Sequence, residues 1–430
     1  MSMVALLFIT LAVCLFLTVP IAISLALASL CVISIGYPPG MMNMLAQSMV
    51  TSVDNYSLMA IPFFMLLGII MEKTGIAQGL IKLAERAVGS KPGGMGTAAI
   101  VACCFFAAIS GSGPACVAAI GSICIPAMRR QNYDPAYCGA LLAAGSTIGP
   151  VIPPSIPMIV YGATVGVSVT GLFASGVIPG ILMGVVLVLW NKFVSKRRGY
   201  AGTPSDAQEP MGKVMKEAIW SIIMPVIVLG GIYAGIFTPT EAAVVGVVYA
   251  LFVGKFIYRQ LTLRKFLDGL LEASVLSATV MIVMGGASTF GRILTLEQVP
   301  TLLTDTLLSI SNSPIVVMLM MNVLLLIAGM FIDTTSNIIL FAPLLCPVAE
   351  AMGFDLTYFG LVMCVNLCIG FLTPPLGVNL FVAQKISGAK LESIIKEVWP
   401  MIGILTALLV LIIAVPDLSL FLPRLMGLIS

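Results

Sequence analysis

Two short polar stretches interrupt long apolar runs, and they carry side chains of the kinds that bind small ions. The stretch DTTSN, residues 333–337, directly follows the apolar run VVMLMMNVLLLIAGMFI, and the stretch SGSGP, residues 110–114, has a similar apolar setting. Carboxylate, hydroxyl and amide oxygens are the ligands that hard cations prefer. Glycine and proline break helices, and a helix that restarts after a break exposes N-terminal amides that attract anions. The two stretches therefore predict sites for a cation such as Na⁺ and for an anion.

Asp333 carries the strongest chemical signal. A lone carboxylate within the hydrocarbon layer is costly, so a counter-charge is expected. No Lys or Arg lies near Asp333 in the sequence, so a bound cation is the natural partner. The alternative is that Asp333 only caps the helix that follows it. The two roles are compatible.

The other residues near these breaks have structural alternatives. Ser110 and Ser112 are small residues that also serve close helix packing. The pairs Pro153-Pro154 and Pro374-Pro375 would serve equally as kinks. A last group comprises polar side chains within interrupted apolar runs: Thr147, Asn366, Thr373 and Asn379.

Two further patterns predict structure rather than chemistry. Glycines at 176, 180 and 184 predict a close helix contact. Glu241 predicts a helix start that is capped by Thr238 or Thr240. Both predictions concern the scaffold around a site and not the site itself.

The composition predicts an all-α polytopic membrane protein. Of the 430 residues, 60% are hydrophobic and 9% are charged, against about 25% charged in soluble domains. Apolar runs of about 20 residues, enough to cross a bilayer, recur along the chain. The chain has no histidine, which excludes metal sites that need it, and its ten cysteines form no CxxC pair. No basic patch with interleaved aromatic residues indicates nucleic-acid binding.

Basic strips between the apolar segments orient the chain by the positive-inside rule. Gly93–Met128 has basic residues beyond both ends, so we expect a re-entrant hairpin entered from the cytoplasm, with its turn at Ser110–Pro114. Pro314–Val348 has none at either end, so we expect a hairpin entered from outside, with its turn near Asp333. No cationic leader precedes the first segment, so we expect no cleaved signal peptide. The first apolar segment, 1–35, is too long for one straight span, so we expect either one tilted helix kinked at Pro20 or two short helices. The other expected membrane or amphipathic segments are 56–71, 137–161, 171–193, 218–237, 242–257, 270–290, 292–313, 356–383 and 398–422.

A shift of 221 residues superimposes the two halves. Ser112 then falls on Asp333, Gly149 on Gly370, and the Pro153-Pro154 pair on the Pro374-Pro375 pair. Five expected crossings separate the units, which makes them inverted repeats. Irregular backbone survives at membrane depth only where it lines an enclosed site, so we expect the four breaks to converge. Inverted repeats with interrupted helices are typical of secondary transporters.

Four segments resemble the signature segments of one family, the large membrane subunits of tripartite ATP-independent periplasmic (TRAP) transporters. The resemblance covers essentially the whole chain, and sialic acid transporters are the most similar members. It implies a Na⁺-coupled symporter of the bacterial inner membrane that imports an organic acid anion. The segments are SGSGPACVAAIGSICIPAM, GSTIGPVIPPSIPMIVYG, DTTSNIILFAPLL and GFLTPPLGVNLFVA.

The resemblance also implies partners. A soluble periplasmic binding protein delivers the substrate, and a small four-helix membrane subunit packs against the large one. Because this chain begins with the large-subunit pattern, we expect the small subunit to be a separate chain. Membrane lipid surrounds the remaining surface.

The resemblance further places the functional residues. Na⁺ is the implied coupling ion, with no organic cofactor and no transition metal. The residues implied in sodium binding are Ser110, Gly111, Ser112, Gly149, Pro150, Asp333, Thr334, Thr335, Gly370 and Thr373. The residues expected to line a substrate site between them are Gly113, Pro153, Pro154, Asn337, Pro374, Pro375 and Asn379.

Elevator-type transporters of the ion transporter superfamily are the implied structural class. In these, a transport domain that holds both hairpins slides against a fixed scaffold. The expected domains are N-terminal scaffold helices in 1–55, transport repeat 1 in 56–168 with its hairpin at 93–128, scaffold helices in 169–268 with a cytoplasmic loop at 195–216, transport repeat 2 in 269–390 with its hairpin at 314–348, and a C-terminal scaffold helix in 391–430.

Three other functions remain as alternatives. A sodium-coupled carboxylate or ion transporter that needs no binding protein is the nearest, and a channel is the second. An intramembrane protease is the enzyme alternative. A Ser–His pair is impossible without histidine, and of the carboxylates only Asp333 is expected at depth. We therefore expect no enzymatic activity.

Overall fold

The computed structural model describes residues 2–88, 91–200 and 210–429, without the side chains of residues 77 and 107–110. Within these ranges the chain is helical and contains no strand. The helices are α1 (Met3–Phe16), α2 (Ile21–Gly36), α3 (Met41–Thr51), the 3-10 helix η1 (Tyr56–Met59), α4 (Ala60–Lys73), α5 (Ile76–Val88), α6 (Gly94–Ser110), α7 (Gly113–Arg130), α8 (Pro135–Ser146), α9 (Ile156–Val165), α10 (Val169–Arg198), α11 (Met211–Tyr233), α12 (Pro239–Phe252), the π-helix η3 (Val253–Ile257), α13 (Leu263–Leu296), α14 (Val299–Ile310), α15 (Pro314–Gly329), α16 (Thr334–Ala351), α17 (Leu356–Gly370), α18 (Val378–Ser387), α19 (Leu391–Ala414) and α20 (Asp417–Leu425).

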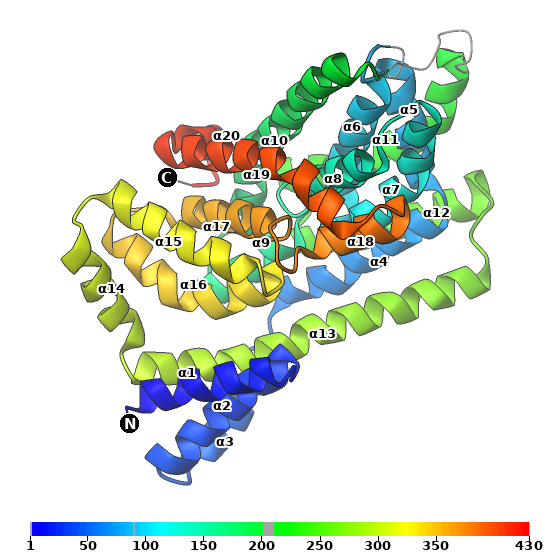
Figure 1. Ribbon diagram of the computed structural model, residues 1–430. Helices are drawn as coiled ribbons and strands as arrows, with labels where there is room; N and C mark the ends of the chain where they lie inside the picture. Colours follow the sequence, from blue (N-terminus) through cyan, green and yellow to red (C-terminus); the bar gives the residue numbers. More distant parts are fainter. Residues whose placement is uncertain (1, 89–90, 201–209, 430) are drawn as a thin grey trace.

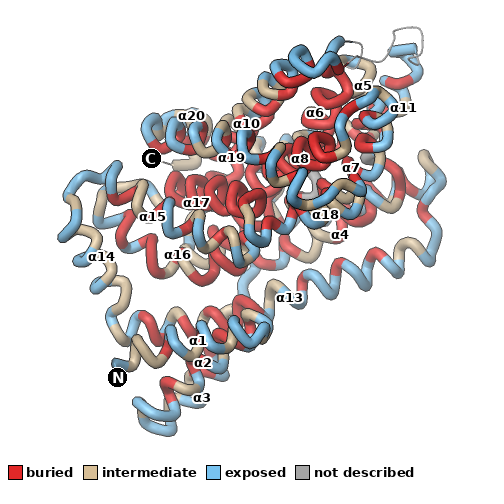
Figure 2. The backbone as a smooth tube through the Cα atoms, in the orientation of Figure 1, coloured by how far each residue is buried: buried red, intermediate tan, exposed pale blue. Residues whose placement is uncertain are grey.

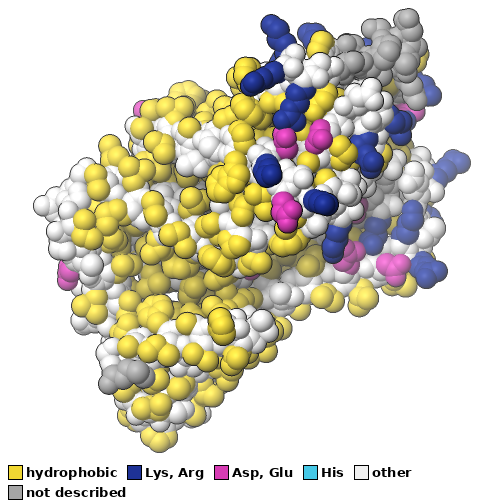
Figure 3. Space-filling view, in the orientation of Figure 1, with side chains coloured by type: hydrophobic (Ala, Val, Ile, Leu, Met, Phe, Trp, Pro, Cys, Tyr) yellow, Lys and Arg dark blue, Asp and Glu magenta, His cyan; other side chains and the backbone are white. Residues whose placement is uncertain are grey.

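The predicted α-helical membrane protein is confirmed. Among the described residues, seven helical segments are long and apolar enough to cross a bilayer. Figure 3 shows Lys and Arg side chains gathered toward the upper right of the visible face, while the rest of that face is mainly hydrophobic. This uneven distribution fits one basic, cytoplasmic side. The seven segments are Tyr56–Lys73, Val169–Arg198, Met211–Tyr233, Pro239–Ile257, Leu263–Leu296, Thr334–Ala351 and Leu391–Ala414.

The predicted repeat is present in the helix bounds. Shifted by 221 residues, α7 coincides with α16 at both ends, and α8 and α9 fall on α17 and α18 within a few residues. The breaks between α8 and α9 and between α17 and α18 contain the two Pro-Pro pairs, and both of these peptide bonds are cis. The prediction that helix-breaking residues occupy equivalent places in two units is therefore confirmed.

Both predicted hairpins form. The helices α6 and α7 pack against each other and meet at Gly111 and Ser112, and α15 and α16 are joined through residues 330–333. Gly111 has a φ of +57°, a left-handed conformation that glycine adopts without steric cost. A Cβ at Gly111 would lie 2.9 Å from the Pro154 carbonyl oxygen, so the absence of a side chain also lets the turn approach the first Pro-Pro break.

The helices pack as two groups. One group comprises α1–α4 and α11–α13, in which α4 packs on α12 and α13 and α2 packs on α13. The other comprises α6–α10 and α15–α20, and it contains both hairpins. In Figure 1 the long α13 runs along the lower edge with α1–α3 beneath it, and the hairpin group lies above. The helices α5 and α14, which are equivalent under the 221-residue shift, each contact both groups.

The first apolar segment forms two packed helices, α1 and α2, which is the second of the two arrangements expected, because Thr18 adopts a positive φ of 60° and Pro20 restarts the helix as the N-cap of α2. Two other element predictions differ from the structure. The segment expected at 398–422 divides into α19 and α20 at Val415 and Pro416. The segment expected at 270–290 continues as α13 from Leu263 to Leu296 and contacts α2, α4 and α16.

The close helix contact predicted from the glycines of α10 is confirmed. A Cβ at Gly176 would lie 2.3 Å from the Val151 carbonyl oxygen, and one at Gly180 would lie 2.3 Å from the Ile152 side chain. Val151 and Ile152 belong to the break between α8 and α9, so the glycines let α10 hold this non-helical segment. Figure 2 shows the neighbouring α17 as a deeply buried helix.

Candidate functional site

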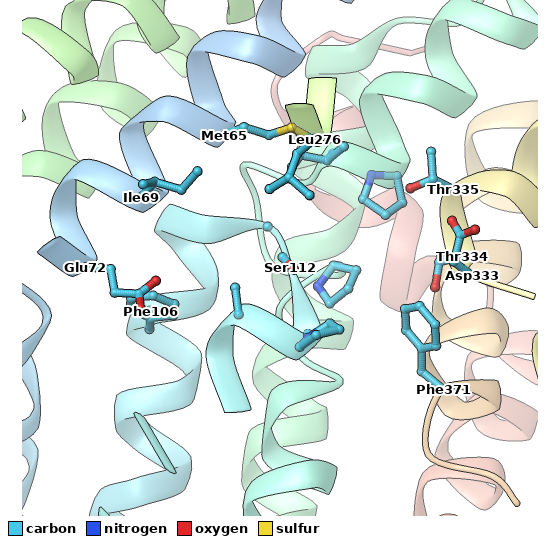
Figure 4. Close-up of a pocket in the computed structure, with 18 residues that line it drawn as sticks. Met65, Ile69, Glu72, Phe106, Ser112, Leu276, Asp333, Thr334, Thr335 and Phe371 are labelled. Carbon is cyan, nitrogen blue, oxygen red and sulfur yellow. The ribbon is translucent and has the colours of Figure 1, made fainter. Parts of the chain in front are cut away.

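The two hairpin turns meet at one cavity. A pocket of about 300 Å³ is lined by residues from the α6–α7 turn, from the start of α16 and from α4. Ser112 and Asp333 both line it, although 221 positions separate them. Figure 4 shows Asp333, Thr334 and Thr335 on one side of this pocket, Met65, Ile69 and Glu72 on the other, and Ser112 between them.

The inner side of the pocket is the N-terminus of α7. Ser112 has extended backbone angles, and its side chain does not cap the helix. Pro114 stands in the first turn, where its missing N–H leaves no hydrogen bond unmade. The amides of this first turn lie beside the pocket lining, in the arrangement that binds anions at helix N-termini.

The outer side of the pocket is the start of α16, which Asp333 caps. The Asp333 Oδ2 accepts a hydrogen bond of 2.9 Å from the Ser336 amide, so Asp333 is the N-cap of α16. The capping role predicted for Asp333 is confirmed. Asn337 donates from Nδ2 to the Ile332 carbonyl oxygen at 2.8 Å. The Asn337 Oδ1 is buried and accepts no hydrogen bond within the described part of the chain.

The pocket contains seven of the residues predicted from the sequence. It is lined by Gly111, Ser112, Gly113, Pro150, Asp333, Thr334 and Thr335. Ser110 ends α6, but its side chain lies outside the described residues. The predicted residues that do not line the pocket are Gly149, Pro153, Pro154, Asn337, Gly370, Thr373, Pro374, Pro375 and Asn379.

Three of these outlying residues pack directly behind the inner turn. A Cβ at Gly149 would lie 3.3 Å from the Ser112 carbonyl carbon and oxygen. A Cβ at Gly113 would lie 3.0 Å from the Oδ1 of Asn379, which is buried and accepts no hydrogen bond from any described residue. Pro154 contacts Gly111 through its carbonyl oxygen. The first break and the start of α18 therefore form the wall behind the inner turn.

The second break is arranged differently. Gly370 packs against Gly329 of α15, with an added Cβ only 2.7 Å from the Gly329 Cα. Thr373 is buried and donates to the Ile369 carbonyl oxygen at 2.8 Å. Pro153 and Pro154 are buried, whereas Pro375 is exposed. The two units thus differ in how far their Pro-Pro breaks are enclosed.

One wall of the pocket was not predicted. Met65, Gly68, Ile69 and Glu72 of α4 line it, together with Leu276 of α13. Their spacing of three and four residues places the α4 group on one helical face, which is the signal that the sequence offered. Glu72 is a second carboxylate in the lining, which the sequence analysis did not place near Asp333. In Figure 4 the two carboxylates lie at opposite sides of the pocket and are not paired.

The charged side chains of the pocket lining are all acidic among the described residues. Asp333 and Glu72 are its two charged side chains, and no Lys or Arg belongs to the pocket lining that the structure describes. An anion that enters this cavity meets two carboxylates and helix N-terminal amides. A cation bound with it would offset the repulsion.

Comparison with known proteins gives a consistent family. Residues 8–418 match the family described as "Tripartite ATP-independent periplasmic transporter, DctM component". The chain is 44% identical over 94% of its length to an isethionate TRAP transporter permease protein of Oleidesulfovibrio alaskensis, and it spans 64% of that longer relative. It is 38% identical to the sialic acid TRAP transporter large permease protein SiaM of Vibrio cholerae, with 96% of each chain covered. It is 39% identical to the C4-dicarboxylate TRAP transporter large permease protein DctM of Pseudomonas aeruginosa, with 91% of this chain and 92% of the relative covered.

Solved structures show the same fold in transporters of low sequence similarity. The YdaH transporter of Alcanivorax borkumensis superimposes with a TM-score of 0.64 at 15% identity, covering 88% of this chain and 89% of the other. MtrF of Neisseria gonorrhoeae gives a TM-score of 0.57 at 11% identity, with 87% and 83% covered. The resemblance found in the sequence motifs is confirmed, and we conclude that the chain belongs to the DctM family of large permease subunits of tripartite ATP-independent periplasmic transporters.

Proposed function

We propose that this chain is the large membrane subunit of a Na⁺-coupled importer of a small organic acid anion. The observation that carries the proposal is the cavity where both hairpin turns meet, lined by Asp333 and Glu72 and by no basic side chain among the described residues. An anionic substrate is repelled there unless cations bind with it. In this proposal Na⁺ offsets the Asp333 charge and fixes both turns, and the substrate anion then binds at the amides of α7.

Sialic acid or another carboxylate is the proposed substrate. The names of the similar permeases refer to sialic acid, C4-dicarboxylates and isethionate, which are all small organic anions. Isethionate, a sulfonate, is the second candidate because its permease shares the 44% identity given above. In this proposal a periplasmic binding protein and a small four-helix membrane subunit complete the transporter, and the words "tripartite" and "periplasmic" in the family description support this composition.

We further propose an elevator movement between the two helix groups. The moving body would be α6–α10 with α15–α20, and the stationary body α1–α4 with α11–α13, since each group packs mainly within itself. This division places α4 and α13 with the scaffold, and α10 and α19 with the hairpins, which differs from the sequence-based domains. The α4 wall of the pocket would then stay behind when the hairpins move.

Uptake into proteoliposomes tests the function. The chain is reconstituted with its small subunit, with or without the binding protein, and substrate uptake is followed with Na⁺ or K⁺ outside. We expect uptake to require both the binding protein and an inward Na⁺ gradient. Equal uptake in K⁺ would contradict sodium coupling, and full uptake without the binding protein would favour a transporter that works alone.

A further inference from the structure

A second pocket, distant in the fold from the hairpin turns, lies between the end of α10 and the start of α19. Its volume is about 420 Å³. The contributing helices carry the basic residues that mark the cytoplasmic side of the membrane. Its lining comprises Trp190, Phe193, Val194, Arg197 and Arg198 of α10 with Lys396, Glu397 and Pro400 of α19.

One of its three cations is already neutralised. Arg198 donates to both carboxylate oxygens of Glu397 at 2.9 Å, and its guanidinium lies 5.3 Å from the centre of the Tyr137 ring. This contact joins α10 to α19. Arg197 and Lys396 are exposed, and neither forms an ion pair with a carboxylate in the described part of the chain. The pocket therefore keeps a net positive charge.

Trp190 adds an aromatic ring to this lining. The Trp190 ring packs 5.6 Å from the ring of Phe193, which is itself exposed. A guanidinium and an ammonium only donate hydrogen bonds. A ligand held by Arg197 and Lys396 must therefore accept hydrogen bonds and carry negative charge, as phosphate oxygens do.

The position of the pocket at the membrane surface distinguishes a lipid phosphate from a free phosphate ion. Trp and Tyr gather where membrane helices meet water, and Lys or Arg collect just beyond them on the cytoplasmic side. Trp190 and the half-exposed Trp399 stand at this level beside the basic residues. Phe193, Val194 and Pro400 give the same pocket an apolar wall. A free phosphate would not use that wall, whereas a lipid would place its acyl chain there.

We propose that this pocket binds the head group of an anionic phospholipid of the cytoplasmic leaflet, with Arg197 and Lys396 on its phosphate and the Trp190 ring in contact with the lipid. The proposal rests on the membrane location of the chain and not on its transport substrate. Basic pockets between membrane helices on the cytoplasmic side are known to hold such head groups. Each of the two cations is expected to strengthen lipid binding about fivefold.

Contact quenching of Trp190 tests the proposal directly. The chain has three tryptophans, so Trp220→Phe with Trp399→Phe leaves Trp190 as the single emitter. The full chain is placed in nanodiscs that contain the same small fraction of brominated phosphatidylglycerol or brominated phosphatidylcholine. We expect several-fold stronger quenching by the anionic lipid than by the zwitterionic lipid.

Charge variants in the single-tryptophan background test whether the preference for the anionic lipid depends on Arg197 and Lys396. Arg197→Gln with Lys396→Gln is expected to remove the preference for the anionic lipid. Lys192→Gln, an exposed lysine on α10 outside the pocket, is the matched control and should keep it. Equal quenching by both lipids, a preference that survives the double variant, or a preference that inorganic phosphate abolishes would each overturn the proposal.

Discussion

At the residue scale, Asp333 has two oxygens and two uses. The Oδ2 caps α16 through the Ser336 amide, and the carboxylate lines the cavity shared by the hairpin turns. The sequence left open whether Asp333 binds a cation in addition to capping the helix. The geometry leaves room for both roles, because one oxygen satisfies the helix end while the other makes no hydrogen bond to a described residue. The negative charge, and not the cap, is what a sodium site would need.

Asp333→Asn separates the two uses. Asparagine caps helices about as well as aspartate, so we expect the melting temperature to stay nearly constant. The loss of charge should raise the Na⁺ concentration for half-maximal uptake about tenfold or more, which corresponds to about 1.4 kcal/mol of lost binding free energy. Initial uptake rates measured against Na⁺ concentration in proteoliposomes, with thermal unfolding in detergent, provide the test.

Asp355→Asn is the matched control. Asp355 caps α17 in the same way, its Oδ1 accepting from the Tyr358 amide at 2.9 Å, and it does not line the pocket. We expect normal uptake and normal Na⁺ dependence. If both variants change uptake equally, Asp333 acts only through its cap and the proposed ion site is wrong.

At the element scale, α10 positions the first helix break. Its glycines face Val151, Ile152 and the α6 side chain Cys104, the last at 2.8 Å from a Cβ added at Gly184. A backbone carbonyl meets Gly176, and it cannot rotate away as a side chain can. The position of the wall behind the inner turn therefore depends on the absence of one methyl group.

Gly176→Ala is expected to destabilise the protein by about 1–3 kcal/mol, because the added Cβ would lie 2.3 Å from the Val151 carbonyl oxygen. Gly403→Ala on α19 is the control, since nothing lies within 4 Å of its added Cβ. We expect this control to keep or raise the melting temperature, as alanine favours helix more than glycine. Thermal unfolding of the two variants in the same detergent gives the comparison, and equal melting temperatures would refute the packing argument.

The sequence predicted the elements better than their grouping. Glycine and proline mark the turn at Gly111 and the paired breaks, because these residues act locally on the backbone. The same local logic predicted a capped helix start at Glu241 with Thr238 or Thr240 as the cap, and Thr238 caps α12 in a capping box with Glu241. The part played by α4 was not predictable in this way. Which face of an apolar helix meets a cavity depends on the neighbouring helices. Glu72 directly follows the expected segment 56–71, so its charge is equally consistent with the start of a solvent-exposed segment.

At the scale of the whole molecule, the pocket lies between the two helix groups. The hairpin turns supply one side, and α4 with Leu276 of α13 supplies the other. The proposed elevator movement requires these sides to separate. Contact between α13 and α16 must then be temporary, whereas contact between α13 and α3 must be permanent.

A disulfide between the groups is expected to stop transport. A Cβ at Gly291 of α13 would lie 4.0 Å from the Cβ of Pro343 of α16, within the range that a disulfide spans. The double variant Gly291→Cys with Pro343→Cys should lose uptake on oxidation and regain it on reduction. Undiminished uptake by the fully oxidised protein would contradict movement between the groups.

The control places a disulfide inside one group. A Cβ at Gly285, also on α13, would lie 3.7 Å from the Cβ of Met49 of α3. Gly285→Cys with Met49→Cys should oxidise and leave uptake unchanged. The ten native cysteines are buried or partly buried and unpaired, so mass spectrometry of the oxidised protein can assign the new bond in each variant.

The matching bounds of α7 and α16 have a consequence for the evolutionary origin of the chain. Two units whose helices begin and end in register are what duplication of one ancestral gene would leave. An ancestor of about half this length, inserted into the bilayer in both orientations, would have paired two identical turns across a two-fold axis. The serine of one turn and the aspartate of the other then record divergence after fusion, when each copy was free to specialise for a different ion or ligand.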